Sequence, residues 1–264
     1  MSELRDALGT PHAPARSEPR IVSLVPSLTE LLCDLGLAGN LVGRSGFCIH
    51  PCETVKRIPK MGGTKDADIE RIRAAEPTHL VVNIDENRRE QVEALARFVP
   101  HVIVTHPLVP EDNLGLFRLF GGIFRREAQA DALAADFNAA REELRRATET
   151  LPRERVLYLI WKEPWMTVSR DTYISAMLAA AGWDTVPEHC ETRYPEVDAV
   201  PQGLTFIERV LLPTEPYRFG ERHLAEAAAR FGAPAQLIDG EMVSWYGGRA
   251  VAGLRYLARL RQAG

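Results

Sequence analysis

Apolar and polar positions near the start of the chain alternate in a way that predicts strands and helices in turn. The β-branched run Ile21–Val25 reads as a buried strand that ends at Pro26. Ser27-Leu28-Thr29-Glu30 has the form of a capping box and predicts a helix from Leu28 to Leu35, which Gly36 ends. The same strand, helix, strand order follows at residues 78–83, 87–98 and 101–105. This alternation implies a parallel sheet.

The middle of the chain carries a long amphipathic pattern. Apolar residues recur at alternating spacings of three and four, through Ala130, Leu133, Phe137, Ala140, Leu144, Ala147 and Leu151. We predict one helix of about 25 residues, roughly 35–40 Å long. That length exceeds an ordinary crossover between strands and is sufficient to span two lobes.

After Pro152 the alternation of strands and helices begins again. Strands are predicted over 155–160, 165–168, 206–212 and 235–238, and helices over 172–181, capped by Asp171, then 221–231 and 249–261. We therefore expect an α/β fold of two Rossmann-like lobes with parallel sheets, joined by one long backbone helix. The expected boundaries are a disordered leader at 1–19, an N-terminal α/β lobe at 20–124, the backbone helix at 125–151 and a C-terminal α/β lobe at 152–264.

Composition and charge limit the kinds of partner and the location that we expect for the chain. The chain has 264 residues, 26% of them charged, and a formal net charge of −4, so it lacks the basic surface that nucleic acid binding requires. No apolar run approaches the roughly 20 residues of a membrane span. The opening residues contain no apolar export signal, so we expect a cytoplasmic protein, or a periplasmic one if a signal has been removed. We also expect a monomer.

Several stretches together resemble the helical-backbone, or class III, substrate-binding proteins of ABC importers. They are RIVSLVPSLTELLCDLGLAGNLVGRSGFCIHP, MGGTKDADIERIRAAEPTHLVVN, the long helix, the GW that follows Ala181, and the final LRYLARL. The chain is most similar to the cobalamin-binding branch. This resemblance implies a transport-associated receptor whose ligand is a corrinoid, haem or ferric siderophore. It also implies acidic docking residues for an ABC permease, with Glu70 at the first-lobe position.

Aromatic side chains follow several of the predicted strands. Phe47, Trp161, Trp165, Trp245 and Tyr246 all fall in loops after strands, where ligands bind in open α/β sheets. A binding site lined by aromatic side chains suits a flat, largely apolar macrocycle, because ring stacking and buried apolar area supply the affinity. Partial burial in the core is the alternative interpretation for each of them.

Polar residues in the same loops are further candidates. Cys48, His50 and Cys52 carry soft ligands for zinc, iron or cobalt, and three interpretations stay open: a bound metal ion, contact of His50 with the chelate, or ordinary packing. His189 and Cys190 complete a metal site only if the fold brings them close. Besides the aromatic residues, ligand-binding roles are predicted for Cys48, His50, Thr64, Asp85, Glu86 and Arg249. Asn87 reads as a helix N-cap.

The favoured hypothesis is a non-enzymatic solute-binding protein that holds a metal chelate, first of all a corrinoid, in a cleft between the lobes. It needs no cofactor, because the chelate is its ligand. We find no ordered nucleophile set and no dinucleotide-binding glycine pattern. The alternatives are a two-lobed metal chelatase that uses His50 and Glu86, and a docking protein with a vestigial cleft.

Overall fold

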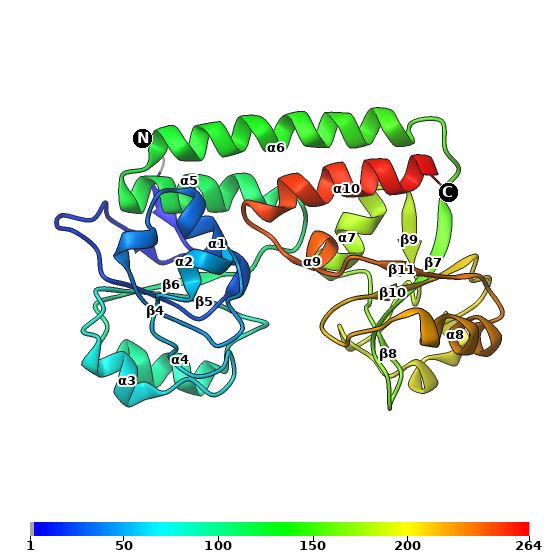
Figure 1. The fold of residues 1–264 in the computed structure, drawn as a ribbon, viewed down its shortest axis with the longest axis horizontal. Helices are drawn as coiled ribbons and strands as arrows, with labels where there is room; N and C mark the ends of the chain where they lie inside the picture. Colours follow the sequence, from blue (N-terminus) through cyan, green and yellow to red (C-terminus); the bar gives the residue numbers. More distant parts are fainter. Residues whose placement is uncertain (1–2, 264) are drawn as a thin grey trace. The chain divides into compact units, whose positions relative to one another are not determined.

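The computed structural model describes residues 3–263, and its contacts divide them into two units. Unit 1 comprises the chain up to Pro107, Glu111–Asp136 and Tyr246–Arg249. Unit 2 comprises Leu108–Pro110, Phe137–Trp245 and the chain from Ala250 onward. Helix α6 (Glu127–Thr148) continues unbroken through the boundary between Asp136 and Phe137 (Figure 1). The predicted fold of two α/β lobes joined by one long helix is confirmed.

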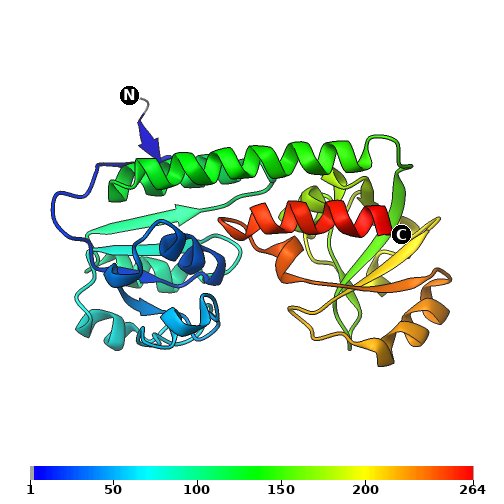
Figure 2. The same ribbon diagram turned by 45° about the horizontal axis from the view of Figure 1, so that its top comes forward.

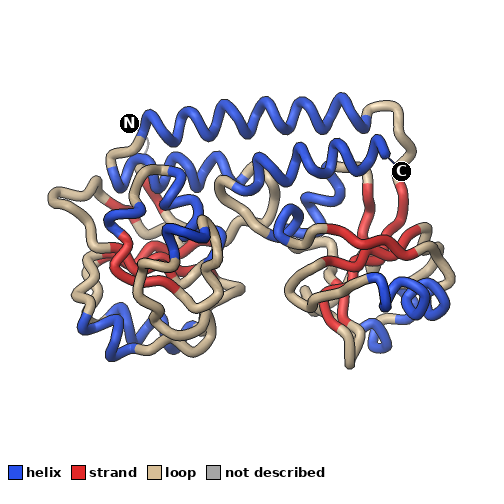
Figure 3. Tube along the Cα trace, in the orientation of Figure 1, coloured by secondary structure: helices blue, strands red, loops and turns tan. Residues whose placement is uncertain are grey.

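A parallel sheet forms the centre of unit 1. Its strands run in the order β4-β3-β5-β6, and every neighbouring pair is parallel. Helices lie on both faces of the sheet (Figure 3). The strands are β3 (Ile21–Ser23), β4 (Leu41–Arg44), β5 (His79–Asn83) and β6 (His101–Thr105), and the helices are α1 (Pro26–Asp34), α2 (Cys52–Val55), α3 (Ile69–Ala74), α4 (Arg89–Ala96) and α5 (Asp112–Phe124), with a 3₁₀ turn η1 at Ala38–Asn40.

Successive side chains along each strand point to opposite faces of the sheet, and this explains why helices pack on both faces. Val22, Leu80 and Val82 join one apolar cluster with residues of α3 and α4. His79 lies one position before Leu80, so it points to the opposite face, where its ring meets the edge of Phe124 in α5 at 5.1 Å between centroids. Since both faces are buried, the strands read as continuous apolar runs.

The start of α1 differs from the prediction. The helix begins at Pro26, and its N-cap is Val25, whose side chain makes no capping hydrogen bond. Proline suits the first helical position because it has no N–H to satisfy and its φ angle is already helical. The predicted capping box at Ser27–Glu30 is therefore wrong, and Glu30 has another partner.

The leader is ordered over its described residues. Strands β1 (Leu4–Arg5) and β2 (Pro11–His12) form a small antiparallel hairpin. The Asp6 carboxylate accepts hydrogen bonds from the N–H groups of Thr10 and Val104, and the Ala7 N–H donates to the Val104 carbonyl. These bonds join the hairpin to the outer edge of β6, so the expectation of disorder is wrong for residues 3–19.

A second sheet organises unit 2, in the order β11-β10-β7-β8, with β9 also paired to β7. All of its pairs are parallel except β7 with β8, which is antiparallel and forms an exception to the predicted parallel sheet. The strands are β7 (Glu154–Trp161), β8 (Met166–Thr167), β9 (Trp183–Thr185), β10 (Arg209–Pro213) and β11 (Ala235–Ile238).

Helices cover this sheet as well. Helix α8 (Leu224–Phe231) packs through Ala227 onto an apolar cluster with Leu157 and Leu212. The other elements are α7 (Tyr173–Ala180), α9 (Glu241–Ser244), α10 (Arg249–Ala263) and the 3₁₀ turns η2 (Val197–Ala199), η3 (Pro201–Gly203) and η4 (Glu221–His223). Figure 2 shows α10 in red alongside the second part of α6 in green, where the Arg255 Nε atom lies 3.2 Å from a Glu143 carboxylate oxygen.

The N-cap of α7 is Thr172 rather than the predicted Asp171. The Thr172 hydroxyl oxygen accepts from the Ser175 N–H at 3.3 Å. Asp171 is one position too early for this bond and instead accepts from the Ser169 hydroxyl. Among the described residues, no helix is long and apolar enough to cross a membrane.

Candidate functional site

Polar residues gather at the carboxyl end of β5 in unit 1. The Asn83 amide donates to the Thr105 hydroxyl at 3.3 Å, and the Asn83 carbonyl oxygen Oδ1 accepts from the Asp85 N–H at 2.8 Å. The Thr105 hydroxyl donates in turn to the Val82 carbonyl at 2.9 Å. The ends of β5 and β6 are therefore held together by side chains as well as by the strand ladder.

Asn87 connects this edge to two other loops. Its Oδ1 atom accepts from the Asn83 N–H at 2.8 Å, and its Nδ2 atom donates to the Thr64 carbonyl at 2.8 Å and to the Leu24 carbonyl at 3.4 Å. The prediction that Asn87 caps a helix is wrong, because α4 begins at Arg89 with Arg88 as its N-cap. Asn87 is buried and bonds to three loops: those that follow β3 and β5, and the loop that contains Thr64.

Three of the predicted ligand residues surround Asn83 and Asn87. Thr64 is half-buried and bonded to Asn87 through its carbonyl. Asp85 is exposed, with one carboxylate oxygen 3.5 Å from the His106 Nε2 atom. The Glu86 carboxylate accepts from the Tyr246 hydroxyl at 2.5 Å. Asp85 and Glu86 are neighbours of Asn83 and Asn87 in sequence, whereas the fold brings Thr64 and Tyr246 to this edge from distant positions.

Residues Tyr246–Arg249 belong to unit 1 although they lie near the end of the chain. Burial and the adjacent Glu86 carboxylate raise the pKa of the Tyr246 hydroxyl well above its usual value. The Gly247 N–H donates to the Asn113 side-chain oxygen at 2.6 Å. Arg249 forms two hydrogen bonds to the Glu30 carboxylate, which explains locally why a cation begins α10. Its predicted ligand role stays a prediction.

Exposed apolar side chains project from the loops that follow β4 and β5. The exposed fractions are 62% for Phe47, 48% for Ile49 and 44% for Ile84. Phe47 lies beside Gly62-Gly63, where Gly62 has a φ of +89° and a Cβ atom would approach the Asp66 carbonyl oxygen to 2.5 Å. Only glycine fits that turn without strain. The loop therefore passes close to its neighbour and supports one side of Phe47.

Cys48 points into the protein. Its Sγ atom lies 3.1 Å from the Thr29 hydroxyl and 3.3 Å from the Ser45 hydroxyl, and burial raises the pKa of the thiol. Cys52 is exposed and His50 is half-buried. Among residues 3–263 no group of three or more His, Cys, Asp or Glu side chains is arranged to hold a metal ion, and the four cysteines form no disulfide.

The predicted aromatic residues of unit 2 separate into different environments. Trp161 ends β7, is 43% exposed and meets Tyr217 edge to face at 5.4 Å between centroids. Trp165 stacks on Phe219 at 5.9 Å and meets Phe231 edge to face at 5.8 Å, so it belongs to the core beneath α8. Of these two tryptophans, Trp161 has the larger exposed area for a ligand.

Trp245 is held by a buried carboxylate. Its indole N–H donates to Glu215 at 2.6 Å, and the Ser244 hydroxyl donates to the same oxygen at 2.8 Å. Burial is the main cause that raises the pKa of Glu215. Trp245 is only 7% exposed, and its orientation is fixed by this bond.

Sequence reasoning missed several residues at these edges. Ile49 and Ile84 are apolar residues inside predicted strand-to-helix loops, and that position was the available signal. Asn83 and Thr105 end predicted strands with polar side chains, which also marks a sheet edge. Glu215 and Tyr217 had no comparable signal, because their importance depends on side chains brought near them by folding.

Glu70, the predicted docking residue, lies in the first turn of α3. Its side chain is 82% exposed, and its carboxylate is 3.7 Å from the Arg73 Nε atom. This is a weak surface ion pair that leaves the carboxylate accessible.

Comparisons with known proteins agree with this architecture. The vitamin B12-binding protein of Pectobacterium atrosepticum is 25% identical over 184 residues, which are 67% of this chain and 65% of that relative. The chain thus spans about 65% of the length of this curated relative.

Solved structures share the fold over most of their length. The periplasmic vitamin B12 binding protein of Vibrio cholerae has a TM-score of 0.78 at 16% identity, covering 93% of this chain and 98% of its own. The apo periplasmic heme-binding protein of Roseiflexus sp. RS-1 has a TM-score of 0.74 at 22% identity, covering 94% and 99%. The family described as periplasmic binding protein matches residues 21–199, and this chain belongs to that family.

Proposed function

We propose that the chain is a solute-binding protein for a metal chelate, first of all a corrinoid such as cobalamin, with haem and ferric siderophores as members of the same ligand class. The observation that carries the proposal is the set of exposed apolar side chains on loops at the carboxyl ends of parallel strands. Each unit has such side chains of its own: Phe47, Ile49 and Ile84 in unit 1, and Trp161, the last residue of β7, in unit 2.

The chemistry of a chelate suits such surfaces. A large planar ring gains affinity mainly from apolar area and stacking, while a few polar groups orient its substituents. In unit 1, Ile84 lies on the loop after β5 that also carries Asp85 and Glu86, whereas Phe47 and Ile49 lie on the loop after β4. The Asp85 and Glu86 carboxylates beside Ile84 offer hydrogen-bond acceptors to the amide substituents of a corrinoid.

The relatives support binding rather than catalysis. Vitamin B12-binding and heme-binding proteins are among the similar proteins, and the family is one of binding proteins. This favours the solute-binding hypothesis over the metal chelatase. The family description also favours the periplasmic alternative over the cytoplasmic one, and with it a role beside an ABC permease. We propose Glu70 as a docking residue for that permease, because its carboxylate is exposed.

The decisive experiment is titration of the purified chain with cobalamin, haem and a ferric siderophore, followed by absorption spectroscopy and calorimetry. We expect saturable binding of one of them. Phe47→Ala and Trp161→Ala should each weaken it by about tenfold or more, as losses of central aromatic contacts do. Leu8→Ala and Phe206→Ala are matched controls, since both side chains are exposed, at 67% and 85%, on other parts of their units. Failure of all three chelates to bind would refute the proposal.

His50→Ala tests axial ligation separately. If the His50 imidazole coordinates the metal of the bound chelate, the variant loses the ligand-field shift in the absorption spectrum. If His50 serves packing alone, the spectrum of the bound chelate stays that of wild type and only stability changes.

A further inference from the structure

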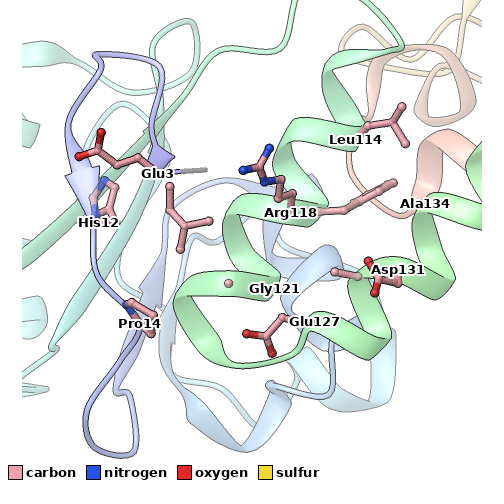
Figure 4. A pocket seen from close by; sticks show the side chains of 13 residues that line it. Glu3, His12, Pro14, Leu114, Arg118, Gly121, Glu127, Asp131 and Ala134 are labelled. Carbon is pink, nitrogen blue, oxygen red and sulfur yellow. The ribbon is translucent and has the colours of Figure 1, made fainter. Parts of the chain in front are cut away.

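A cavity lies in unit 1 away from all the residues discussed above as ligand contacts. It has a volume of about 560 Å³ and three walls: the leader hairpin, α5 and the first turns of α6 (Figure 4). Pockets for small organic molecules measure roughly 300–1,000 Å³, so this one has a suitable size. None of the predicted binding residues lines it.

The floor of the cavity is apolar, and its walls pack closely against one another at two glycines of α5. A Cβ atom on Gly121 of α5 would approach the Ala130 Cβ of α6 to 2.6 Å, and one on Gly122 would approach the Leu4 side chain to 2.7 Å. The glycines therefore let α6 and the hairpin approach α5 closely. Leu114, Phe117 and Ala134 complete the apolar lining.

His12 gives the cavity a polar atom with no partner. Its side chain is 6% exposed, and its Nε2 atom lies 3.3 Å from the Asp6 carboxylate. Within residues 3–263 nothing bonds the Nδ1 atom. In the tautomer that donates Nε2–H to the Asp6 carboxylate, the Nδ1 atom has a lone pair that can accept a hydrogen bond.

The rim adds negative charge. Glu127 and Asp131 stand one turn apart on the cavity face of α6, and neither carboxylate has an ion-pair or hydrogen-bond partner among the described residues. Arg118 is the one cationic side chain at the described rim, while Glu3 is paired with Arg5 at 2.7 Å. Two like charges at this spacing repel each other, and a bound cation would relieve the repulsion.

We propose that this cavity binds a small organic cation, a protonated amine on an apolar body. The apolar part fills the floor between Leu4, Phe117 and Ala134. The ammonium group lies near Glu127 and Asp131 on the α6 wall, and the His12 ring lines the hairpin wall of the same cavity (Figure 4). The site is separate from chelate binding, so each is tested without the other.

Calorimetry and amide NMR of the full chain with phenylethylammonium test the proposal, with phenylethanol and phenylpropionate as neutral and anionic analogues of similar shape. We expect saturable shifts at His12, Ala130 and Ala134, and an affinity for the cation that falls with added salt. Phenylpropionate should bind more weakly than phenylethanol.

Two variants sharpen the test. Glu127→Gln/Asp131→Asn should weaken the cation by about two- to fivefold for each carboxylate and leave phenylethanol unchanged, whereas Glu90→Gln on α4 should change neither. Ala134→Leu should abolish binding of both by filling the floor. Absence of saturable shifts at the cavity, or equal affinity for the cation and phenylpropionate, would overturn the proposal. The charge variant decides the matter even if Ala134→Leu disturbs folding.

Discussion

Glu30 and Arg249 form a bidentate ion pair, with distances of 2.7 and 2.6 Å between the carboxylate oxygens and the guanidinium nitrogens, although 219 positions separate them in sequence. The side chains are only 15% and 12% exposed. Asp34 lies on the same helix, and its pKa is raised to about 6 by burial and by Glu30, while Arg249 lowers it. Arg249 is thus the cation that compensates two neighbouring carboxylates in unit 1.

Replacement of Arg249 should therefore destabilise the protein. Arg249→Met leaves Glu30 with no counter-ion in a partly buried site, and we expect a loss of about 2–3 kcal/mol in the free energy of unfolding by urea. Arg145→Met is the matched control, because its Glu142 partner sits at an exposed surface where a pair contributes less than about 1 kcal/mol. Equal losses in the two variants would contradict this account of the pair.

His79 should make the protein sensitive to acid. Burial and the neighbouring His101 and His12 lower the pKa of His79 to about 4, from an ordinary 6.5. Below pH 6.5 the unfolded chain binds this proton and the folded chain does not. Stability therefore falls as the pH drops from 6.5 to 4, by about 2–3 kcal/mol from this group.

His79→Phe keeps an aromatic ring between His101 and Phe124 and removes the titration. Its free energy of unfolding should lose less on acidification from pH 7 to 4.5 than that of wild type. His189→Gln, at an exposed position, should follow the wild-type curve. A His79→Phe curve parallel to wild type would show that another group causes the acid loss.

Asn87 should be required for the order of three loops. Asn87→Asp replaces the Nδ2 donor with an oxygen that faces the carbonyls of Thr64 and Leu24. We expect a loss of about 2–3 kcal/mol, because two buried acceptors lose their donor and meet a charge. Amide exchange should accelerate in residues 62–66. Asn138→Asp on the exposed surface of α6 serves as the control, and comparable losses in both variants would argue against the network.

Trp161 and Trp165 should respond oppositely to truncation. Trp165→Ala removes contacts with Phe219 and Phe231 and should cost about 3–5 kcal/mol of stability. Trp161→Ala removes a half-exposed ring and should cost much less, while it weakens chelate binding. The measurement is a pair of urea transitions beside the ligand titration. A stable Trp165→Ala variant that binds poorly would assign the ligand role to Trp165 instead.

The elements were predicted better than their ends. Strand β6 matches the predicted residues 101–105, because its β-branched run is a local signal, and β11 matches the predicted residues 235–238, which lie between Gly232-Ala233-Pro234 and Asp239-Gly240. The predicted starts of α1 and α7 differ from the observed ones by two residues and one residue. Each region offers more than one residue that suits the start of a helix: Pro26 or Ser27 for α1, and Asp171 or Thr172 for α7. The leader was predicted to be disordered, and its order depends on a bond from Asp6 to Val104, 98 positions away.

The sequence by itself determined the α/β alternation, the long helix and the class of side chain that each strand-to-helix loop offers, since hydrophobic periodicity and turn chemistry act over a few residues. Only the tertiary structure decided which of those side chains are exposed to solvent and which are buried against other parts of the protein. Phe47 and Trp161 remain exposed, Cys48 turns toward Thr29, and Trp165 joins the core of unit 2. Arg249 acquired Glu30 as its partner in the same way. Such outcomes depend on contacts between distant segments, for which a single sequence contains no local signal.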